Sequence, residues 1–62
     1  MKTNIIDYNN KIIVTLTDKR LLYLNRGDFI DLNNKSYSIQ YKKLFVDIDE
    51  LEIRVDDGIR RM

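Results

Sequence analysis

Cysteine and histidine are both absent from this chain of 62 residues. Their absence excludes disulfide bonds, ordinary zinc sites, and catalysis by a thiolate or an imidazole. A domain of this size buries a small core and usually gains stability from disulfides, a metal or a partner subunit. Good packing and self-association are the sources that remain, so we treat a homo-oligomer and a monomer as equal alternatives.

Long apolar runs are absent too, and residues 1–30 contain no unbroken apolar stretch. We therefore expect neither a signal peptide nor a membrane span. The lack of cysteine suits a reducing compartment. The expected location is the cytoplasm of a bacterial or phage-infected cell.

Alanine and proline are also missing, whereas lysine, asparagine and isoleucine are plentiful. Alanine is the best helix former, and the isoleucine, valine, threonine and tyrosine that are present favour strands. The same bias is typical of an AT-rich genome, such as that of a low-GC bacterium or its phage. Composition therefore predicts an all-β protein.

Two asparagine pairs predict two β-hairpins. Asn9-Asn10 and Asn33-Asn34 each lie between segments rich in β-branched and aromatic residues. Asparagine tolerates a positive φ, which a two-residue hairpin turn requires. The residue pairs that these turns place opposite each other are Ile5 with Val14, Ile6 with Ile13, and Ile30 with Tyr37.

The two hairpin sequences resemble each other, because residues 6–11 recur in similar form at 30–35, and 21–24 align with 45–48. We interpret this as similar turn chemistry, with an internal duplication as the alternative. Residues 21–24 are expected to form a strand that ends at a turn over 25–28, where Gly27 supplies backbone freedom.

The last third of the chain alternates apolar and acidic residues, but its phase flips at Asp49-Glu50. A two-residue hairpin there would place Asp47 opposite Glu52, and like charges in that position are destabilising. A bulge or a single 3₁₀ turn is therefore expected instead. The strand should end at residues 56–58, and residues 59–62 should form a loose tail.

Five or six short strands joined by tight turns predict one all-β domain over residues 1–62. We expect a small antiparallel barrel or strongly bent sheet, SH3-like rather than OB-like, because SH3-like chains are about this long and often carry a 3₁₀ turn before the last strand. The predicted core consists of Ile5, Ile12, Val14, Leu16, Leu22, Leu24, Ile30, Ile39, Val46, Ile48, Leu51, Ile53 and Val55.

Charge is unevenly distributed, although the net charge is only +1. Residues 11–43 are rich in lysine and arginine, whereas residues 44–57 are rich in aspartate and glutamate. The candidate binding residues are Arg20, Arg26, Tyr41, Lys42 and Lys43 on a basic side, and Asp47, Asp49, Glu50 and Glu52 on an acidic side.

Catalysis and metal binding are not expected. The carboxylates over residues 47–52 are close enough in sequence for acid–base chemistry or for a divalent cation. However, a strand exposes alternate residues to solvent, and this explains acids at such positions without a site. We predict no enzyme activity, no metal and no cofactor.

Protein interaction is the function we predict, because a compact domain with both signs of charge and open sheet edges suits docking on another protein or on itself. An AT-rich phage or mobile-element accessory protein that modulates a host protein fits this description. The alternative is a small barrel that binds single-stranded nucleic acid by stacking bases on tyrosines beside basic residues. That face would consist of Tyr23, Tyr37, Tyr41, Arg20, Lys35, Lys42 and Lys43.

Overall fold

A computed structural model describes residues 1–60, and over this range the chain is almost entirely β-structure. It contains six strands and one short 3₁₀ helix, η1. In chain order the elements are β1 (Lys2–Ile6), β2 (Ile12–Leu16), η1 (Lys19–Tyr23), β3 (Phe29–Leu32), β4 (Lys35–Phe45), β5 (Glu50–Val55) and β6 (Ile59–Arg60). The prediction of a small all-β domain is confirmed.

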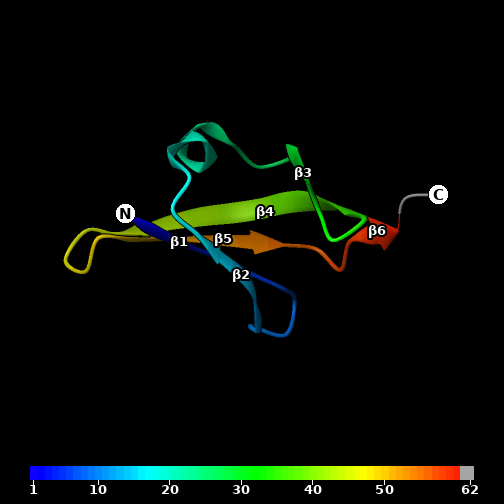
Figure 1. The fold of residues 1–62 in the computed structure, drawn as a ribbon, viewed down its shortest axis with the longest axis horizontal. Coiled ribbons are helices and arrows are strands. Elements are labelled where there is room, and N and C mark those ends of the chain that lie inside the picture. The colour runs from blue at the N-terminus through cyan, green and yellow to red at the C-terminus, as the bar shows by residue number, and fades with distance from the viewer. Residues whose placement is uncertain (61–62) are drawn as a thin grey trace.

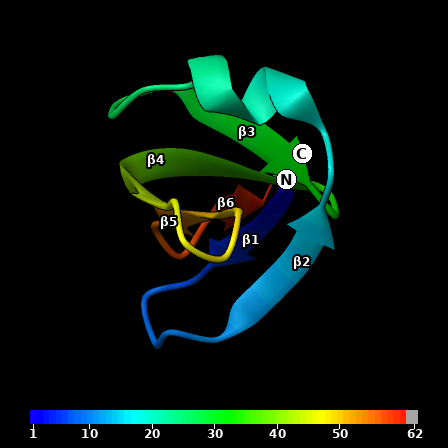
Figure 2. The same cartoon turned by 90° about the vertical axis from the view of Figure 1, so that its left-hand side faces the viewer.

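The strands form one strongly curled sheet in the order β2-β1-β5-β4-β3, with β6 paired to the start of β4. Figure 2 shows the sheet curling as a half-barrel from β2 round to β3, with η1 over its open side. The prediction of a wholly antiparallel sheet is wrong, because β1 runs parallel to β5. Side chains alternate in the same way in parallel and antiparallel strands, so the sequence pattern carries no information on direction.

The loop between β1 and β2 is organised by the side chain of Asp7. Its Oδ1 accepts hydrogen bonds from the backbone N–H groups of Asn9 at 2.8 Å and Lys11 at 3.0 Å. The backbone N–H of Asp7 donates to the carbonyl of Lys11 at 2.9 Å, and Asn10 adopts a φ of 64°. The reversal therefore encloses one residue more than the predicted two-residue turn.

A β-bulge at Ile13 compensates for that extra residue. Ile5 pairs with Val14 as predicted, but Ile6 pairs with Ile12 rather than with Ile13. The bulge leaves Ile12 on the opposite face of the sheet from Val14. Ile12 is consequently 60% exposed, and its prediction as a core residue is wrong.

The second asparagine pair forms the predicted two-residue turn. Asn33 and Asn34 both have positive φ angles, 49° and 67°, as a type I′ turn requires. Leu32 and Lys35 close the turn, and the pairing of Ile30 with Tyr37 is confirmed.

Residues 21–24 do not form the predicted strand, because 19–23 form η1. The carboxylate of Asp18 caps the helix by accepting the backbone N–H of Arg20 at 2.9 Å. A 3₁₀ helix has three residues per turn, so Leu21 and Leu24 share one side. These two pack into or against the core, whereas Leu22 is exposed and its prediction as a core residue is wrong. Since residues 21–23 belong to η1 and residues 46–48 lie in a turn, the recurrence in the sequence does not correspond to a repeated hairpin-plus-strand structure.

The phase flip at Asp49-Glu50 lies where the turn of a β-hairpin meets β5. The prediction of a bulge or a 3₁₀ turn at this position is wrong. Strand β4 ends at Phe45, β5 begins at Glu50, and these two residues pair. The four residues 46–49 make the turn, in which Asp49 has a φ of 53°. A four-residue turn pairs Glu52 with Lys43 and so avoids the like-charge pair that argued against a hairpin.

The core lies on the concave face of the half-barrel, and Val46 and Ile48 lie outside it. Both were predicted as core residues, but the turn places them beyond the covered part of the sheet, where they are exposed. The buried apolar residues are Ile5, Ile6, Leu21, Tyr37, Ile39, Leu51, Ile53 and Val55. Half-buried residues packed against them include Ile13, Val14, Leu16, Leu24, Ile30 and Leu32.

The end of the chain is more ordered than predicted. Strand β5 ends at Val55 as expected, but Ile59 and Arg60 form β6 against Ser36 and Lys35. The loose-tail prediction is therefore wrong for 59–60, and residues 61–62 lie outside the described range. No helix among the described residues has the length and apolar character needed to cross a membrane.

Candidate functional site

The β4–β5 hairpin has two chemically different faces. On its convex face, Lys43 pairs with Glu52 and Phe45 pairs with Glu50. On its concave face, the pairs are Lys42 with Ile53 and Leu44 with Leu51. A bulge between Ile39 and Tyr41 adjusts the phase of β4 so that these concave residues continue the direction of the core.

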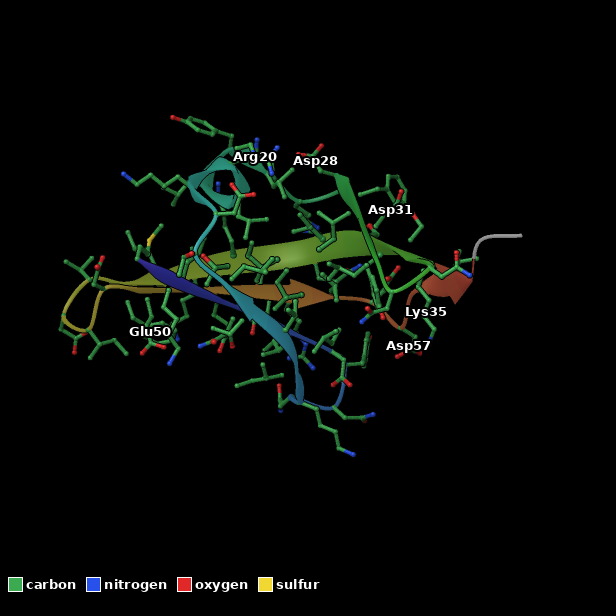
Figure 3. The ribbon with its side chains drawn as sticks, in the orientation of Figure 1. Arg20, Asp28, Asp31, Lys35, Glu50 and Asp57 are labelled. Atoms are coloured by element: carbon green, nitrogen blue, oxygen red, sulfur yellow. The ribbon has the colours of Figure 1, made fainter. Side chains whose placement is uncertain are left out.

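Polar side chains on the convex face bind one another. The hydroxyl of Tyr41 donates to Glu52 Oε2 at 3.0 Å, and Asn4 Nδ2 donates to Glu50 Oε1 at 3.1 Å. Asn4 also accepts the hydroxyl of Thr15 at 2.8 Å, and the ammonium of Lys2 lies 3.6 Å from Glu50. In Figure 3, Glu50 points away from η1. This face is a hydrogen-bonded polar surface in contact with solvent.

The concave face changes from buried to exposed along the hairpin. Leu51 and Ile53 are almost completely buried in the core. Leu44, the next residue on this face, is 52% exposed, and in the turn beyond it Ile48 is 56% exposed and Val46 80%. Figure 1 shows the reason, because the hairpin extends past η1 and past the N-terminus at one end of the elongated molecule. We call Leu44, Val46 and Ile48 the hairpin surface.

Charged groups flank the hairpin surface on both sides. At the stem, the ammonium of Lys42 donates to the backbone carbonyl of Leu22 at 2.5 Å. At the tip, the carboxylate of Asp49 lies 3.5 Å from the ammonium of Met1, and Asp47 is exposed. Among the described residues neither Lys42 nor Asp47 forms an ion pair. Within the described range, the surface therefore has a cation at its stem that is hydrogen-bonded but not ion-paired, and a carboxylate in its turn that is not ion-paired.

Lys43 lies on the convex side of the same hairpin. Its ammonium is 5.1 Å from the centre of the Phe45 ring, within cation–π range. Because its register partner is Glu52, the predicted basic and acidic sides meet in one hairpin and are not separate surfaces.

Arg20 and Arg26 are not part of the hairpin. Arg20 Nε lies 3.0 Å from both carboxylate oxygens of Asp18, and its Nη2 also donates to Asp18. Hydrogen bonds from the Arg20 side chain lower the pKa of Asp18 to about 2, and the same contact raises the pKa of Arg20. Arg26 lies in the turn over 25–28, in which the N–H of Asp28 donates to the Asn25 carbonyl at 3.0 Å.

The structure does not assemble the base-stacking face that the nucleic-acid alternative needs. Tyr37 is buried in the core, Tyr41 donates to Glu52 on the convex face, and Tyr23 lies on η1. Lys35 lies at the opposite end of the molecule from the β4–β5 turn, as Figure 3 shows. The aromatic rings therefore face different directions and do not form one platform.

Sequence reasoning missed the hairpin surface itself. It assigned Val46 and Ile48 to the core and did not select Leu44. The signal was present in the phase flip, because an apolar–acidic alternation that reverses over four residues also fits a hairpin whose turn carries apolar side chains. Burial against another element cannot be predicted from alternation alone.

The described residues contain no pocket and no group of three or more acidic residues that could hold a metal ion. The acidic residues of the hairpin point in different directions, with Glu50 and Glu52 on the convex face and Asp47 in the turn. The chain matches no protein-family model, no curated protein and no solved structure.

Proposed function

We propose that this protein is a non-catalytic interaction domain that binds a protein partner through the hairpin surface. The observation that carries the proposal is the exposure of Leu44, Val46 and Ile48 together at one end of the molecule. Single exposed apolar residues are ordinary, but a group of them at the end of a core is typical of a contact surface.

The construction of the hairpin supports this proposal. On its convex face Tyr41 donates to Glu52, while its concave face presents Leu44 beside Lys42, and its turn presents Val46 and Ile48 on either side of Asp47. An apolar centre with charged groups at the rim is the usual anatomy of a protein interface. Binding there would bury the apolar side chains and leave the charged groups to orient the partner.

Substitutions in the turn test the proposal without disturbing the core. Val46→Ser and Ile48→Ser each remove apolar area from exposed positions, so both variants should fold normally. Immobilised wild-type protein and variants would be used to capture partners from native cytoplasm, and the captured protein would then be titrated by calorimetry. We expect each variant to lose about tenfold or more in affinity, because a buried valine or isoleucine contributes about 1.5–3 kcal/mol.

Phe29→Ser is the matched control. Phe29 is 68% exposed but lies on β3, where it pairs with Ser38, away from the β4–β5 turn (Figure 1). It should bind as wild type does. Equal binding by wild type, Val46→Ser and Ile48→Ser would show that the hairpin surface is not the contact.

We further propose that the protein serves as an accessory factor of a phage or mobile element in the cytoplasm of its host, where it modulates a host protein. The alanine-free, asparagine-rich composition supports this use. For the architecture we retain an SH3-like half-barrel over an OB-like one on the basis of the chain length; η1 lies between β2 and β3, not before the last strand, and does not bear on this choice.

A further inference from the structure

We propose that the partner of the hairpin surface is the same surface of a second copy, packed antiparallel across a two-fold axis. This inference rests on the proposed function, since it names the occupant of the same site. It follows from the order of charges along the hairpin and from the small size of the core.

The charges of the hairpin are complementary to those of a reversed copy. Lys42 lies at the stem on the concave face, Leu44 follows on that face, and Asp47 lies at the tip, in the turn between Val46 and Ile48. When a second hairpin is laid over the first in the opposite direction, the tip carboxylate of each copy approaches the stem ammonium of the other. A parallel arrangement would instead place like charges together, which costs free energy.

Two-fold symmetry makes this contact closed. In an isologous interface the two copies use the same surface. Leu44, Val46 and Ile48 of one copy therefore contact and bury the same three residues of the other. A contact closed in this way gives a dimer. Most of the other exposed apolar side chains lie on other elements, with Tyr8 and Ile12 at the β1–β2 loop, Leu22 and Tyr23 on η1, and Phe29 on β3.

The size of the domain favours self-association at this place. Within the described residues eight apolar side chains are buried, few for an independent domain without disulfides or a metal. The concave apolar face does not stop at η1 but continues to Leu44, where no element of the described chain covers it. A second hairpin in that position would extend the core across the axis.

Two charge-reversed variants provide the decisive experiment. Light scattering after size exclusion would be measured from low micromolar to millimolar concentration for wild type, Asp47→Lys, Lys42→Glu, and an equimolar mixture of the two variants. Wild type should form a dimer. Each variant alone should dimerise about tenfold more weakly, because symmetry turns both rim ion pairs into repulsive contacts.

The mixture should recover wild-type dimerisation. In a dimer of one Asp47→Lys chain with one Lys42→Glu chain, both rim contacts again join opposite charges. That recovery should weaken as salt is added. Because a fold defect in one variant cannot be repaired by mixing it with the other, recovery distinguishes the proposed contact from a structural effect. Val46→Ser should be monomeric, and Phe29→Ser should dimerise as wild type does.

Three results would overturn the inference. The first is a wild-type protein that stays monomeric at all concentrations. The second is a mixture that is as monomeric as its components. The third is a dimer that Phe29→Ser breaks and Val46→Ser does not. If a monomeric wild-type protein still binds a different partner that Val46→Ser loses, the second copy is excluded and the proposed function stands. If that binding also fails, both proposals fall.

Discussion

Gly58 packs against the aromatic ring of Tyr37, so closely that a Cβ on Gly58 would lie 2.5 Å from Cε1 of that ring. The backbone also requires glycine there, because Gly58 has a φ of +78°. Asp56 holds the turn in place, since its Oδ1 accepts the backbone N–H of Gly58 at 3.1 Å and that of Ser38 at 3.0 Å. This contact covers the buried tyrosine and leads the chain into β6.

Gly58→Ala should therefore be strongly destabilising. The left-handed backbone costs an alanine about 1–2 kcal/mol, and the overlap with Tyr37 adds about 1–3 kcal/mol. We expect a total loss of about 2–5 kcal/mol in the free energy of unfolding, measured by urea denaturation. A domain of this size has a total stability of only about 3–9 kcal/mol, so the effect should be easy to detect.

Gly27→Ala is the control for the Gly58 variant. Gly27 also has a positive φ, +93°, but nothing lies within 4 Å of the position that a Cβ would take. Its substitution should cost only the backbone term of about 1–2 kcal/mol. Equal losses for the two variants would show that the contact between Gly58 and Tyr37 adds nothing.

Thr3→Val should stabilise the protein. Thr3 is 1% exposed, and its hydroxyl is the buried side-chain polar group of the described residues that has no hydrogen-bond partner. An unsatisfied buried hydroxyl destabilises the folded state by about 1–3 kcal/mol. Valine has nearly the same shape as threonine and lacks this hydroxyl. We expect a gain of about 1–2 kcal/mol in the free energy of unfolding, read from the urea midpoint at constant slope.

Thr15→Val gives the opposite sign and tests the same reasoning. The hydroxyl of Thr15 donates to Asn4 Oδ1 at 2.8 Å on the convex face. Its removal should lower stability by about 0.5–1.5 kcal/mol, the usual net contribution of a hydrogen bond. A gain from both substitutions would mean that β-propensity, not hydrogen bonding, decides the result.

Asn34→Gly should stabilise the β3–β4 turn by about 0.5 kcal/mol. Asn34 has a φ of 67° at the second position of a type I′ turn, where glycine is preferred. Asn9→Gly is the comparison, because Asn9 has no positive φ and its replacement only adds freedom to the unfolded chain. The second variant should lose about 0.4–1 kcal/mol in thermal or urea unfolding. Equal changes in stability for Asn34→Gly and Asn9→Gly would contradict the assignment of a type I′ turn to Asn33-Asn34.

Asp18→Asn should reduce stability at neutral pH but not in acid. Arg20 lowers the folded-state pKa of Asp18 from the ordinary value of 3.8 to about 2. A lowered folded pKa means that the carboxylate stabilises the fold above pH 3.8 and loses this effect as the pH falls toward 2. The thermal midpoints of wild type and variant should therefore differ at pH 7 and converge below pH 3.8. A constant difference at every pH would show that capping, not charge, carries the effect.

The local turns could be predicted from the sequence because turn chemistry is a property of neighbouring residues. Asn33-Asn34 adopts the predicted turn, and the pairing of Ile30 with Tyr37 follows from it. The first hairpin shows how such a prediction can be right for an incomplete reason. Ile5 meets Val14 as expected, but only because the longer loop and the bulge at Ile13 cancel each other.

The candidate site could be predicted only in part. Charge alone selects Lys42 and Asp47, and the structure places Lys42 at the stem of the hairpin and Asp47 in its turn between two exposed apolar residues. Val46 and Ile48 were assigned to the core, because alternation shows that a residue lies on the apolar face but not whether anything covers it. The same limit explains why Leu22 was wrongly predicted as a core residue. The three-residue period of η1 turns Leu21 toward the core and leaves Leu22 exposed.

The sequence by itself determined the β class, the turns over 25–28 and at Asn33-Asn34, the absence of thiol and imidazole chemistry, and most of the buried alternation in β5. These depend on composition and on residues close in the chain. Only the tertiary structure decided that β1 runs parallel to β5, that the sheet is open between β2 and β3, and that the hairpin extends beyond the core. Each of these depends on contacts between residues far apart in sequence. The free energy gained when such residues bury one another is set by the apolar area that they remove from water, and neighbouring residues in the chain do not reveal it.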